Sequence, residues 1–539
     1  MREQSGAPKP ESEQISGQVK ISELSNIPAK FNIAEYFLDR PAAEHPNRIA
    51  IVGEPAGVSY GELASLANRF ASALAREGIA RGERVLIILP DSAEFIAAFF
   101  GAAKIGAVAV PVNPMTREAD YAHYLRDSRA RLVIVHEGAL AAFLPAASGF
   151  PADAIVVLGS EAAGLKGMKR WSEWIGARDE KIAARPTLAT DAAFFLYTSG
   201  SGGNPKAAVH LHKDMLVTSR GFAQGVMGIS AADRTYSVSK LFFAYGLGNG
   251  MYFPLSAGAS CVLDPDRPRP ERAAEILVNH RPTIFFAVPT FYLALLGEVD
   301  RGLAADFSSV RLAVSAGERL PPEIFERFKM RFGLEILDGI GSTEMLHMFL
   351  SARRGHVRAG SCGEPVPGYE AKIVDDAGSP VADGEIGNLW VKGGSAFSGY
   401  WGIPELTART KQGEWVVTGD KFYRDTEGYY HYCGRADDMM KVSGMWVAPT
   451  EVENALLGHA AVAEAAVVGV IDEAGLTRPL AFVVIHPDSA PTPALGEELR
   501  EFVRGRLPGY KCPSEVKFLD ALPKTATGKI QRFRLRGAP

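Results

Sequence analysis

The chain of 539 residues is too long for one simple core, so its length predicts two or more domains. Hydrophobic residues make up 47% of it and charged residues 22%, which is typical of a globular protein with an ample core. The net charge of −4 is spread over 58 basic and 62 acidic side chains, and it offers no electrostatic footprint for nucleic acid or an anionic membrane.

The N-terminal residues are polar and lack an apolar segment, so we expect 1–28 to form a disordered leader and no signal peptide. The most apolar stretch, 95–112, is interrupted by Lys104, Gly106 and Pro111, which favours a buried helix and a strand over a membrane span. Four widely spaced cysteines without a C-x-x-C pair argue against a disulfide framework or a zinc site. These features predict a cytoplasmic protein.

Alternating helices and strands are predicted after the leader. Ser59 and Glu62 have the spacing of a capping box, at the start of a helix that Gly78 ends. Asp91 and Glu94 are expected to open the next helix. Continuous apolar runs, typical of strands buried on both faces, occur at 84–90, 106–112 and 131–136. Such alternation indicates right-handed βαβ units and a largely parallel sheet.

The pattern changes in the second half of the chain. Alternation returns at 282–320, whereas 380–433 contains short strands with glycine turns and predicts a β-rich subdomain. A compact αβ pattern begins near 438, and the polar, glycine-flanked stretch 434–444 is the expected domain boundary. The sequence therefore predicts an α/β fold: a large N-terminal domain of parallel αβ layers with a β-rich subdomain, and a small αβ C-terminal domain.

The stretch YTSGSGGNPKAAVH, residues 197–210, is rich in glycine and hydroxyl groups and contains Lys206. Glycine lets backbone N–H groups approach an anion closely, but such a run is more often a turn or a linker. The Walker pattern does not fit, because Pro205 stands in place of its last glycine and Ala207 follows the lysine. This loop alone leaves a phosphate site and a connector as alternatives.

Three acidic or basic residues stand beside turns further along the chain. Glu344 follows Gly-Ser-Thr, where it is either a solvated residue or a magnesium ligand beside phosphate oxygens. Asp420 is expected to end an apolar strand, as a turn aspartate or as an acceptor for a ribose diol. Lys529, in PKTATGK, would usually be a solvent-facing lysine. Taken singly, each of the three favours the plain structural explanation.

The order of the motifs changes this balance. YTSGSGGNPK, GSTE, TGD, GRADDMMKVSG and PKTATGK resemble, in order and rough spacing, the acyl-adenylate-forming (AMP-binding) enzymes, over nearly the whole chain past residue 30. Within that superfamily, KLFFAYGLGNG, DGIGSTEMLHMF and LPKTATGKIQRFRLR look most like benzoate-CoA and 4-hydroxybenzoate-CoA ligases. The resemblance implies an N-terminal AMP-binding domain over 29–434 and a mobile C-terminal domain over 435–539, with a hinge near Asp437.

The resemblance also implies a reaction and its substrates. An aryl carboxylate attacks the α-phosphate of ATP to give acyl-adenylate and pyrophosphate, and the thiol of coenzyme A then displaces AMP. Lys529 would bridge the carboxylate and the α-phosphate, Thr343 would bind phosphate, and Glu344 would bind Mg²⁺. The implied partners are thus a small aromatic acid, ATP and CoA, with neither nucleic acid nor membrane. Acetylation of Lys529 by a protein acetyltransferase would silence adenylation.

The remaining nucleotide and CoA contacts are assigned by the same resemblance. A phosphate loop over 198–206 would grip the β- and γ-phosphates, the 317–319 stretch and Asp338 would face adenine, Asp420 and Arg435 the ribose, and Gly444 the pantetheine path. The full set is Thr198, Ser199, Gly200, Ser201, Gly202, Lys206, Gly317, Glu318, Arg319, Asp338, Asp420, Arg435 and Gly444. Gly202 and Ala207 depart from the family's usual Thr and Gly, so we expect pyrophosphate handling to be altered in degree.

An acyl pocket is assigned to positions that would otherwise be ordinary core. The matching residues are Phe243, Ala244, Tyr245, Gly341, His347 and Met348. Small residues leave room for a flat ring, the aromatic side chains can pack against it, and His347 could hydrogen-bond a ring hydroxyl. Two alternatives to a CoA ligase stay open: an enzyme that loads a carrier protein, and a catalytically idle homologue that binds nucleotide or aryl acid.

Overall fold

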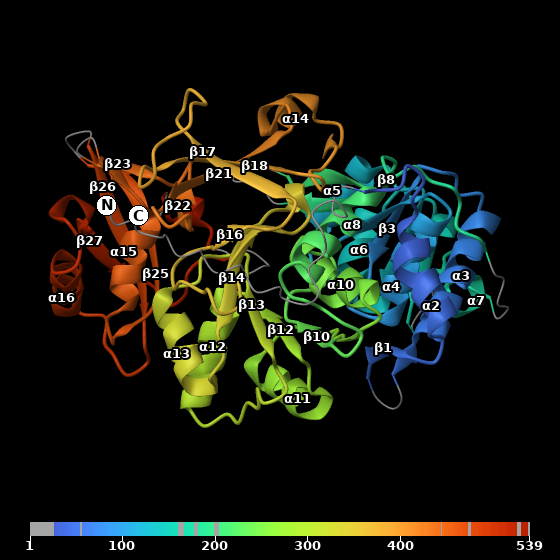
Figure 1. Cartoon of the computed structure of the whole chain (residues 1–539), viewed down its shortest axis with the longest axis horizontal. Coiled ribbons are helices and arrows are strands. Elements are labelled where there is room, and N and C mark those ends of the chain that lie inside the picture. The colour runs from blue at the N-terminus through green and yellow to red at the C-terminus, as the bar shows by residue number, and fades with distance from the viewer. Residues whose placement is uncertain are drawn as a thin grey trace, which may run out of the picture.

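The computed structural model describes residues 26–53, 57–159, 167–176, 182–198, 204–442, 445–472, 476–524 and 530–536 (Figure 1). Two large sheets form the N-terminal part, a smaller antiparallel sheet covers one end of them, and an αβ unit holds the C-terminal residues. This arrangement confirms the predicted α/β class. No helix in the described ranges has both the length and the apolar character to cross a membrane.

An eight-stranded sheet contains the predicted strands 84–90, 106–112 and 131–136. Strands β4, β3, β5, β6 and β7 run parallel, and β8 joins β4 in parallel before pairing with β9 antiparallel. In order across the sheet the strands are β19 (Gly399–Tyr400), β9 (Lys206–Leu211), β8 (Ala192–Thr198), β4 (Val108–Pro111), β3 (Arg84–Ile88), β5 (Leu132–His136), β6 (Ile155–Leu158) and β7 (Lys169–Arg170).

A nine-stranded sheet lies beside it. Its six inner strands, from β1 to β14, run parallel, and the strands at its two ends, β2 on one side and β15 and β16 on the other, pair antiparallel. Its order is β16 (Glu364–Pro365), β15 (Met348–Ser351), β14 (Ile336–Gly341), β13 (Leu312–Ser315), β12 (Ile284–Ala287), β10 (Arg234–Ser237), β11 (Ser260–Val262), β1 (Ile49–Val52) and β2 (Val58–Ser59). The carboxyl ends of parallel strands meet at one edge of such a sheet, which is where ligands bind in open α/β folds.

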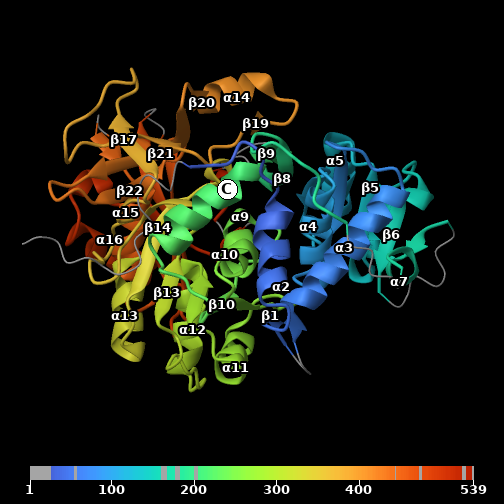
Figure 2. The same cartoon turned by 45° about the vertical axis from the view of Figure 1, so that its right-hand side comes forward.

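Helices α3 (Tyr60–Arg76) and α4 (Ala93–Lys104) pack between the two sheets (Figure 2). Alternate strand residues explain this: Ile87 faces that central core, while Leu86 packs outward against α5 (Glu118–Ser128) and α6 (Leu140–Ala146). The outer face of the nine-stranded sheet is covered by α11 (Pro270–His280), α12 (Pro289–Asp300) and α13 (Pro322–Phe332). Together these elements form five alternating helix and sheet layers.

Shorter helices connect these layers. They are η1 (Glu35–Asp39), α2 (Arg40–Glu44), η2 (Glu137–Ala139), η3 (Ala152–Ala154), α7 (Trp171–Trp174), α8 (His212–Thr218), η5 (Ser219–Gln224), α9 (Ala244–Leu247), η6 (Gly248–Tyr252), α10 (Phe253–Ser256) and η7 (Thr343–Met345). The capping box of α3 is confirmed, because Ser59 and Glu62 exchange hydrogen bonds. The expected opening of α4 by Asp91 is wrong: Ser92 is its N-cap, and the buried Asp91 carboxylate accepts from Leu241 N instead.

The β-rich region is confirmed as an antiparallel sheet, which begins earlier than predicted. Its strands are β17 (Tyr369–Val374), β18 (Gly387–Gly393), β20 (Lys411–Gln412), β21 (Trp415–Arg424) and β22 (Tyr430–Arg435), with α14 (Pro404–Thr410) beside β20. Asp420 lies inside β21 and does not end a strand, contrary to expectation. The strand continues because Asp420, Lys421 and Phe422 still pair with β22.

The C-terminal αβ unit has its own core. It consists of β23 (Met440–Val442) paired with β24 (Met445–Val447), a sheet of β25 (Val462–Ile471), β26 (Thr477–Ile485) and β27 (Glu515–Phe518), and the helices α15 (Pro449–Leu457), α16 (Pro493–Arg504), η8 (Gly509–Lys511) and α17 (Arg532–Leu535). The short helix α17 packs Leu535 against the face of β25 and β26. The last described residues therefore belong to the C-terminal αβ unit, as α15 does.

Candidate active site

The predicted phosphate loop connects β8 to β9. Thr198 and Lys206 face each other at the base of this hairpin. Because β8 is parallel to β4, Thr198 lies at the carboxyl edge of the eight-stranded sheet. Nε2–H of His123, on α5, donates to the carbonyl of Pro205 at 2.7 Å and fixes the returning chain. Four predicted contacts, Ser199, Gly200, Ser201 and Gly202, lie outside the described residues.

Tyr400 connects the two charged residues predicted to handle phosphate and metal. Its hydroxyl donates to Oε1 of Glu344 at 2.6 Å, and Nζ of Lys206 lies 5.9 Å from the centre of its ring. Burial, followed by the nearby Glu344 carboxylate, raises the pKa of Tyr400 above its usual range, so the hydroxyl stays a donor. Lys206 and Glu344 are therefore brought to one aromatic side chain, Lys206 over its ring and Glu344 at its hydroxyl.

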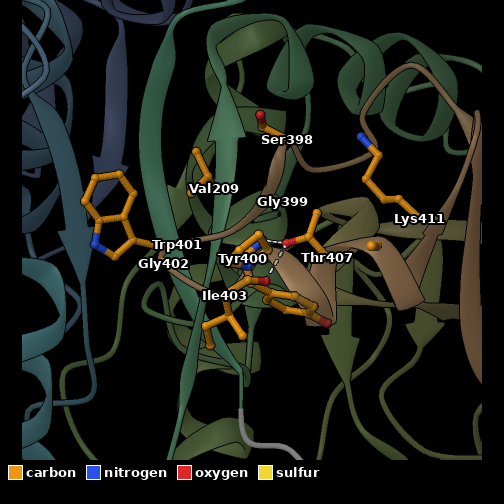
Figure 3. Close-up of a pocket in the computed structure, with 11 residues that line it drawn as sticks. Val209, Ser398, Gly399, Tyr400, Trp401, Gly402, Ile403, Thr407 and Lys411 are labelled. Carbon is orange, nitrogen blue, oxygen red and sulfur yellow. Dashed lines mark hydrogen bonds between the residues drawn. The ribbon is translucent and has the colours of Figure 1, made fainter.

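Sequence reasoning missed Tyr400, although its place in the fold is well defined. Strand β19 adds to the edge of the eight-stranded sheet with Tyr400 opposite Ala208. A pocket of about 560 Å³ lies beside Tyr400. At this pocket Oγ1 of Thr407 accepts from Tyr400 N at 2.9 Å and donates to Ile403 O at 3.0 Å; the residues that line the pocket are drawn in Figure 3. These bonds hold the backbone of the 399–403 segment against α14 and so fix the direction of the tyrosine side chain.

His210 links the phosphate-loop strand to the motif that contains Thr343 and Glu344. Its Nε2 is hydrogen-bonded to the carbonyl oxygen of Thr343 at 2.8 Å, and its Nδ1 is hydrogen-bonded to Asp214 Oδ2 at 2.9 Å. Both side chains are fully buried, and Asp214 Oδ2 also accepts from Leu211 N. Since both ring nitrogens are engaged, the imidazole holds η7 at a fixed position relative to β9. The sequence alone did not indicate this role of His210.

The residues assigned to adenine lie on neighbouring strands of the nine-stranded sheet. Ser315 of β13 is opposite Asp338 of β14, and the 317–319 stretch follows β13 directly. Gly317 has φ of +92°, a conformation that side chains rarely adopt. Within the described structure, Oδ1 of Asp338 and Oγ of Ser315 are buried without a hydrogen-bond partner.

Asp338 is suited to receive a donor from a ligand. Burial raises its pKa to about 8, against the opposing effects of Ser315 and nearby backbone amides. An unpartnered buried acceptor costs on the order of 1 kcal/mol or more, and the exocyclic amino group of adenine would satisfy it. Oε2 of Glu318 accepts from Thr290 N at 3.3 Å.

Asp420 and Arg435, assigned to the ribose, are cross-strand partners on β21 and β22. Nη1 of Arg435 donates to Asp420 Oδ1 at 3.1 Å and to Thr418 O at 2.9 Å. Gly419 has φ of +74°, a conformation that side chains rarely adopt, and the absence of a side chain there leaves room for the Arg435 guanidinium. Asp420 is buried on β21, an inner strand of the β-rich sheet that lies between β18 and β22.

The acyl-pocket residues meet around His347. Its ring centre lies 5.4 Å from that of Tyr245 and 4.6 Å from that of Phe253, and its Nε2–H donates to Asn249 Oδ1 at 3.1 Å. Burial lowers the pKa of His347 to about 3, so the ring is neutral. Sequence analysis named Phe243, Ala244 and Tyr245 near the start of α9 but missed Asn249 and Phe253, which lie on the next turns of the same apolar segment.

Two glycines allow the backbone to pack closely against His347. A Cβ at Gly341 would lie 2.5 Å from His347 O, and one at Gly248 would lie 2.7 Å from Cδ2 of the His347 ring. The neighbouring Met348 is buried on β15. The neutral imidazole of His347 is thus packed among aromatic rings, side chains suited to contact a flat apolar group with one polar substituent.

The described residues include no group of three or more His, Cys, Asp or Glu side chains placed to hold a metal ion. One carboxylate together with phosphate oxygens is a ligand set that Mg²⁺ accepts in nucleotide sites, and Glu344 offers such a carboxylate. Thr343, Glu344, Lys206 and Tyr400 fit that arrangement. Gly444 and Lys529 lie outside the described residues.

The family model described as AMP-binding enzyme matches residues 38–401, and the AMP-binding enzyme C-terminal domain matches 451–529. A benzoate–CoA ligase of Thauera aromatica is 43% identical over 95% of this chain and 97% of its own. A 4-hydroxybenzoate–CoA/benzoate–CoA ligase of Rhodopseudomonas palustris is 40% identical over 94% of each chain.

Among solved structures, a benzoate CoA ligase from Burkholderia xenovorans LB400 matches with a TM-score of 0.87 and 44% identity, over 94% of this chain and 100% of that one. The five ordered motifs, the layered fold and both family matches agree. This chain belongs to the AMP-binding enzyme family.

Proposed function

We propose that this protein is an ATP-dependent aryl-CoA ligase. It would convert benzoate or 4-hydroxybenzoate, with ATP and CoA, into the aryl-CoA thioester, AMP and pyrophosphate. The observation that carries the proposal is the Lys206–Tyr400–Glu344 cluster at the carboxyl edge of the sheet, in a fold whose relatives are named benzoate–CoA and hydroxybenzoate–CoA ligases.

In the adenylation step, some residues of the chain supply positive charge and others hold the reacting groups in place. Lys206 and backbone N–H groups of the 198–206 loop bind the β- and γ-phosphates, while Thr343 binds phosphate through a turn that His210 holds. Glu344 would hold Mg²⁺, and the ion would supply positive charge against the leaving pyrophosphate. Lys529 bridges the aryl carboxylate and the α-phosphate, which lowers the barrier between two anions.

The thioester step needs a different face of the C-terminal unit. In our proposal the unit rotates about Asp437, which removes Lys529 from the nucleotide and places Gly444 beside the path of the pantetheine thiol. Residues 1–28 would be a leader outside this cycle, 29–434 the nucleotide domain and 435–539 the rotating domain. Because loss of the lysine charge would stop adenylation, acetylation of Lys529 would act as an off switch.

The pocket around His347 supports an aromatic acid. A neutral imidazole held by Asn249 can exchange a hydrogen bond with a ring hydroxyl, which supports 4-hydroxybenzoate beside benzoate. The four free thiols, three of them buried, support a reducing compartment, and we place the protein in the cytoplasm.

A single assay tests the proposal. Purified full-length protein with ATP, Mg²⁺ and CoA is screened over benzoate, hydroxybenzoates, cyclohexanecarboxylate and short fatty acids. AMP and an acyl-CoA with aromatic acids are the expected products. Release of ADP, or no nucleotide turnover with any acid, would overturn the proposal. Adenylate formation without transfer to CoA would instead support a carrier-protein partner.

A further inference from the structure

The segment that follows Lys529 is fixed by an ion-pair network at the domain junction. Nε and Nη2 of Arg532, at the start of α17, donate to the Glu453 carboxylate at 3.1 and 2.8 Å. Glu453 is buried on α15 and also accepts from Val467 N at 2.8 Å. A buried carboxylate needs such partners, since an unpaired charge in this position is costly. Arg532 is therefore held firmly to the C-terminal unit.

The same network reaches the junction itself through Asp438. Nη2 of Arg536 donates to Asp438 Oδ1 at 2.6 Å and to the carbonyl of Asp437 at 2.9 Å, while Arg532 Nη1 lies 3.7 Å from Asp438 Oδ2. Each carboxylate oxygen of Asp438 thus faces a different guanidinium. Two arginines and two carboxylates make the network electrically balanced.

The residues just before Asp437 are held to the other side of the junction. Arg435 pairs with Asp420 across β21 and β22, and Ala436 N donates to Gly419 O at 2.9 Å. Asp437 therefore stands between a segment held by β21 and a segment held by α17. Turn hydrogen bonds from the N–H groups of Asp438 and Met439 to Arg435 O cross the junction between them.

We infer that Arg536, through Asp438, is a positioning residue that makes the lysine-bearing segment and the C-terminal side of the hinge one mechanical unit. The inference rests on the proposed function, because it assigns this network a role in the adenylation step. Rotation at Asp437 would then carry Lys529, which lies three residues before Arg532, to a fixed place at the nucleotide. Without the Asp438 contact, α17 would be held by the Arg532–Glu453 pair and by the packing of Leu535 alone, and the position of the ammonium relative to the hinge would be less well defined.

Helix α17 offers a matched control. Arg534 is exposed on the same helix, and its guanidinium carbon lies 5.9 Å from the ring centre of the neighbouring Phe533. Arg536→Gln and Arg534→Gln each remove one positive charge from the same stretch, but only the first removes the contact with Asp438. Arg536→Lys keeps a charge that can still pair with that carboxylate.

The experiment measures both half-reactions on the full-length variants. ATP–pyrophosphate exchange with benzoate reports adenylation, and thioester formation from supplied benzoyl-adenylate and CoA reports transfer. For Arg536→Gln we expect the kcat of exchange to fall about tenfold against Arg534→Gln, with the KM for ATP unchanged, since a small misplacement of a reacting group has effects of this size. Transfer should be retained, and Arg536→Lys should recover exchange.

Hydrogen–deuterium exchange gives a readout that needs no catalysis. Peptides over 530–536 should exchange faster in Arg536→Gln than in Arg534→Gln, at the same melting temperature. Equal exchange and equal kinetics in the two variants would overturn the inference, as would a parallel loss of both half-reactions with a lowered melting temperature. A different result would separate the inference from the proposed function. If Arg536→Gln exchanges deuterium faster but the wild-type protein makes no AMP from any acid, the proposed function is overturned and, with it, the role of Arg536 in adenylation.

Discussion

The N-terminal site and the C-terminal lysine segment are built with opposite degrees of burial. His210 and Asp214, which hold the Thr343 turn, are fully buried, whereas the side chains of Arg536 and Asp438 are 37% and 19% exposed. Buried charge-assisted contacts fix geometry, while exposed ion pairs contribute little stability and exchange readily with water. The nucleotide side is therefore organised in advance by buried contacts, whereas the outer contact of the lysine-side network, between Arg536 and Asp438, is open to water.

Removing the lysine itself tests this division most severely. We expect Lys529→Ala to lower adenylation on the order of a hundredfold or more, since a group that stabilises transition-state charge is lost. Thioester formation from supplied acyl-adenylate should be spared, because that step uses the rotated domain. Pyrophosphate exchange and single-turnover transfer measure the two steps, and an equal loss in both would contradict the contrast between the two regions.

On the N-terminal side, Tyr400→Phe removes one hydroxyl and leaves the ring beneath Lys206. The carboxylate of Glu344 then loses the donor at 2.6 Å that orients it. We expect about a tenfold lower kcat/KM for MgATP, the effect of losing one hydrogen bond to a charged group. The magnesium dependence of ATP binding, measured by calorimetry, should shift to higher concentration. Tyr429→Phe is a control, because Tyr429 contacts Arg358 just before β22 and not Glu344. A similar shift of the magnesium dependence in Tyr429→Phe would refute the role of Tyr400.

The buried Asp338 predicts how stability depends on pH in the preorganised region. Its pKa is raised to about 8 in the folded protein, so between its unfolded value and pH 8 the folded state binds the extra proton. Its contribution is therefore fully present at acid pH and is lost as pH rises, by at most about 1.4 kcal/mol per pH unit. Asp338→Asn should flatten this slope in denaturant unfolding between pH 5 and 8; an unchanged slope would place the proton elsewhere.

The sequence predicted the fold and the site unequally, for physical reasons. The strands at 84–90 and 131–136 and the capping box at Ser59 are local patterns, and the structure confirms them. Tyr400 could not be found, because its contact with Glu344 depends on β19 pairing with β9 nearly two hundred residues earlier. His210 was missed for a related reason, since its partner is a backbone carbonyl at Thr343, which has no sequence signature.

The smallest expected effect concerns the acyl pocket, where the preorganised region meets the substrate. His347→Ala would leave a space beside Tyr245 and Phe253 and remove the imidazole that Asn249 orients. If that imidazole bonds a ring hydroxyl, the preference for 4-hydroxybenzoate over benzoate should fall several-fold, the value of one modest hydrogen bond. The ratio of kcat/KM for the two acids isolates this effect from any general loss of packing, which lowers both values together. An unchanged ratio would leave His347 a packing residue, and the specificity of the pocket would then lie in its shape.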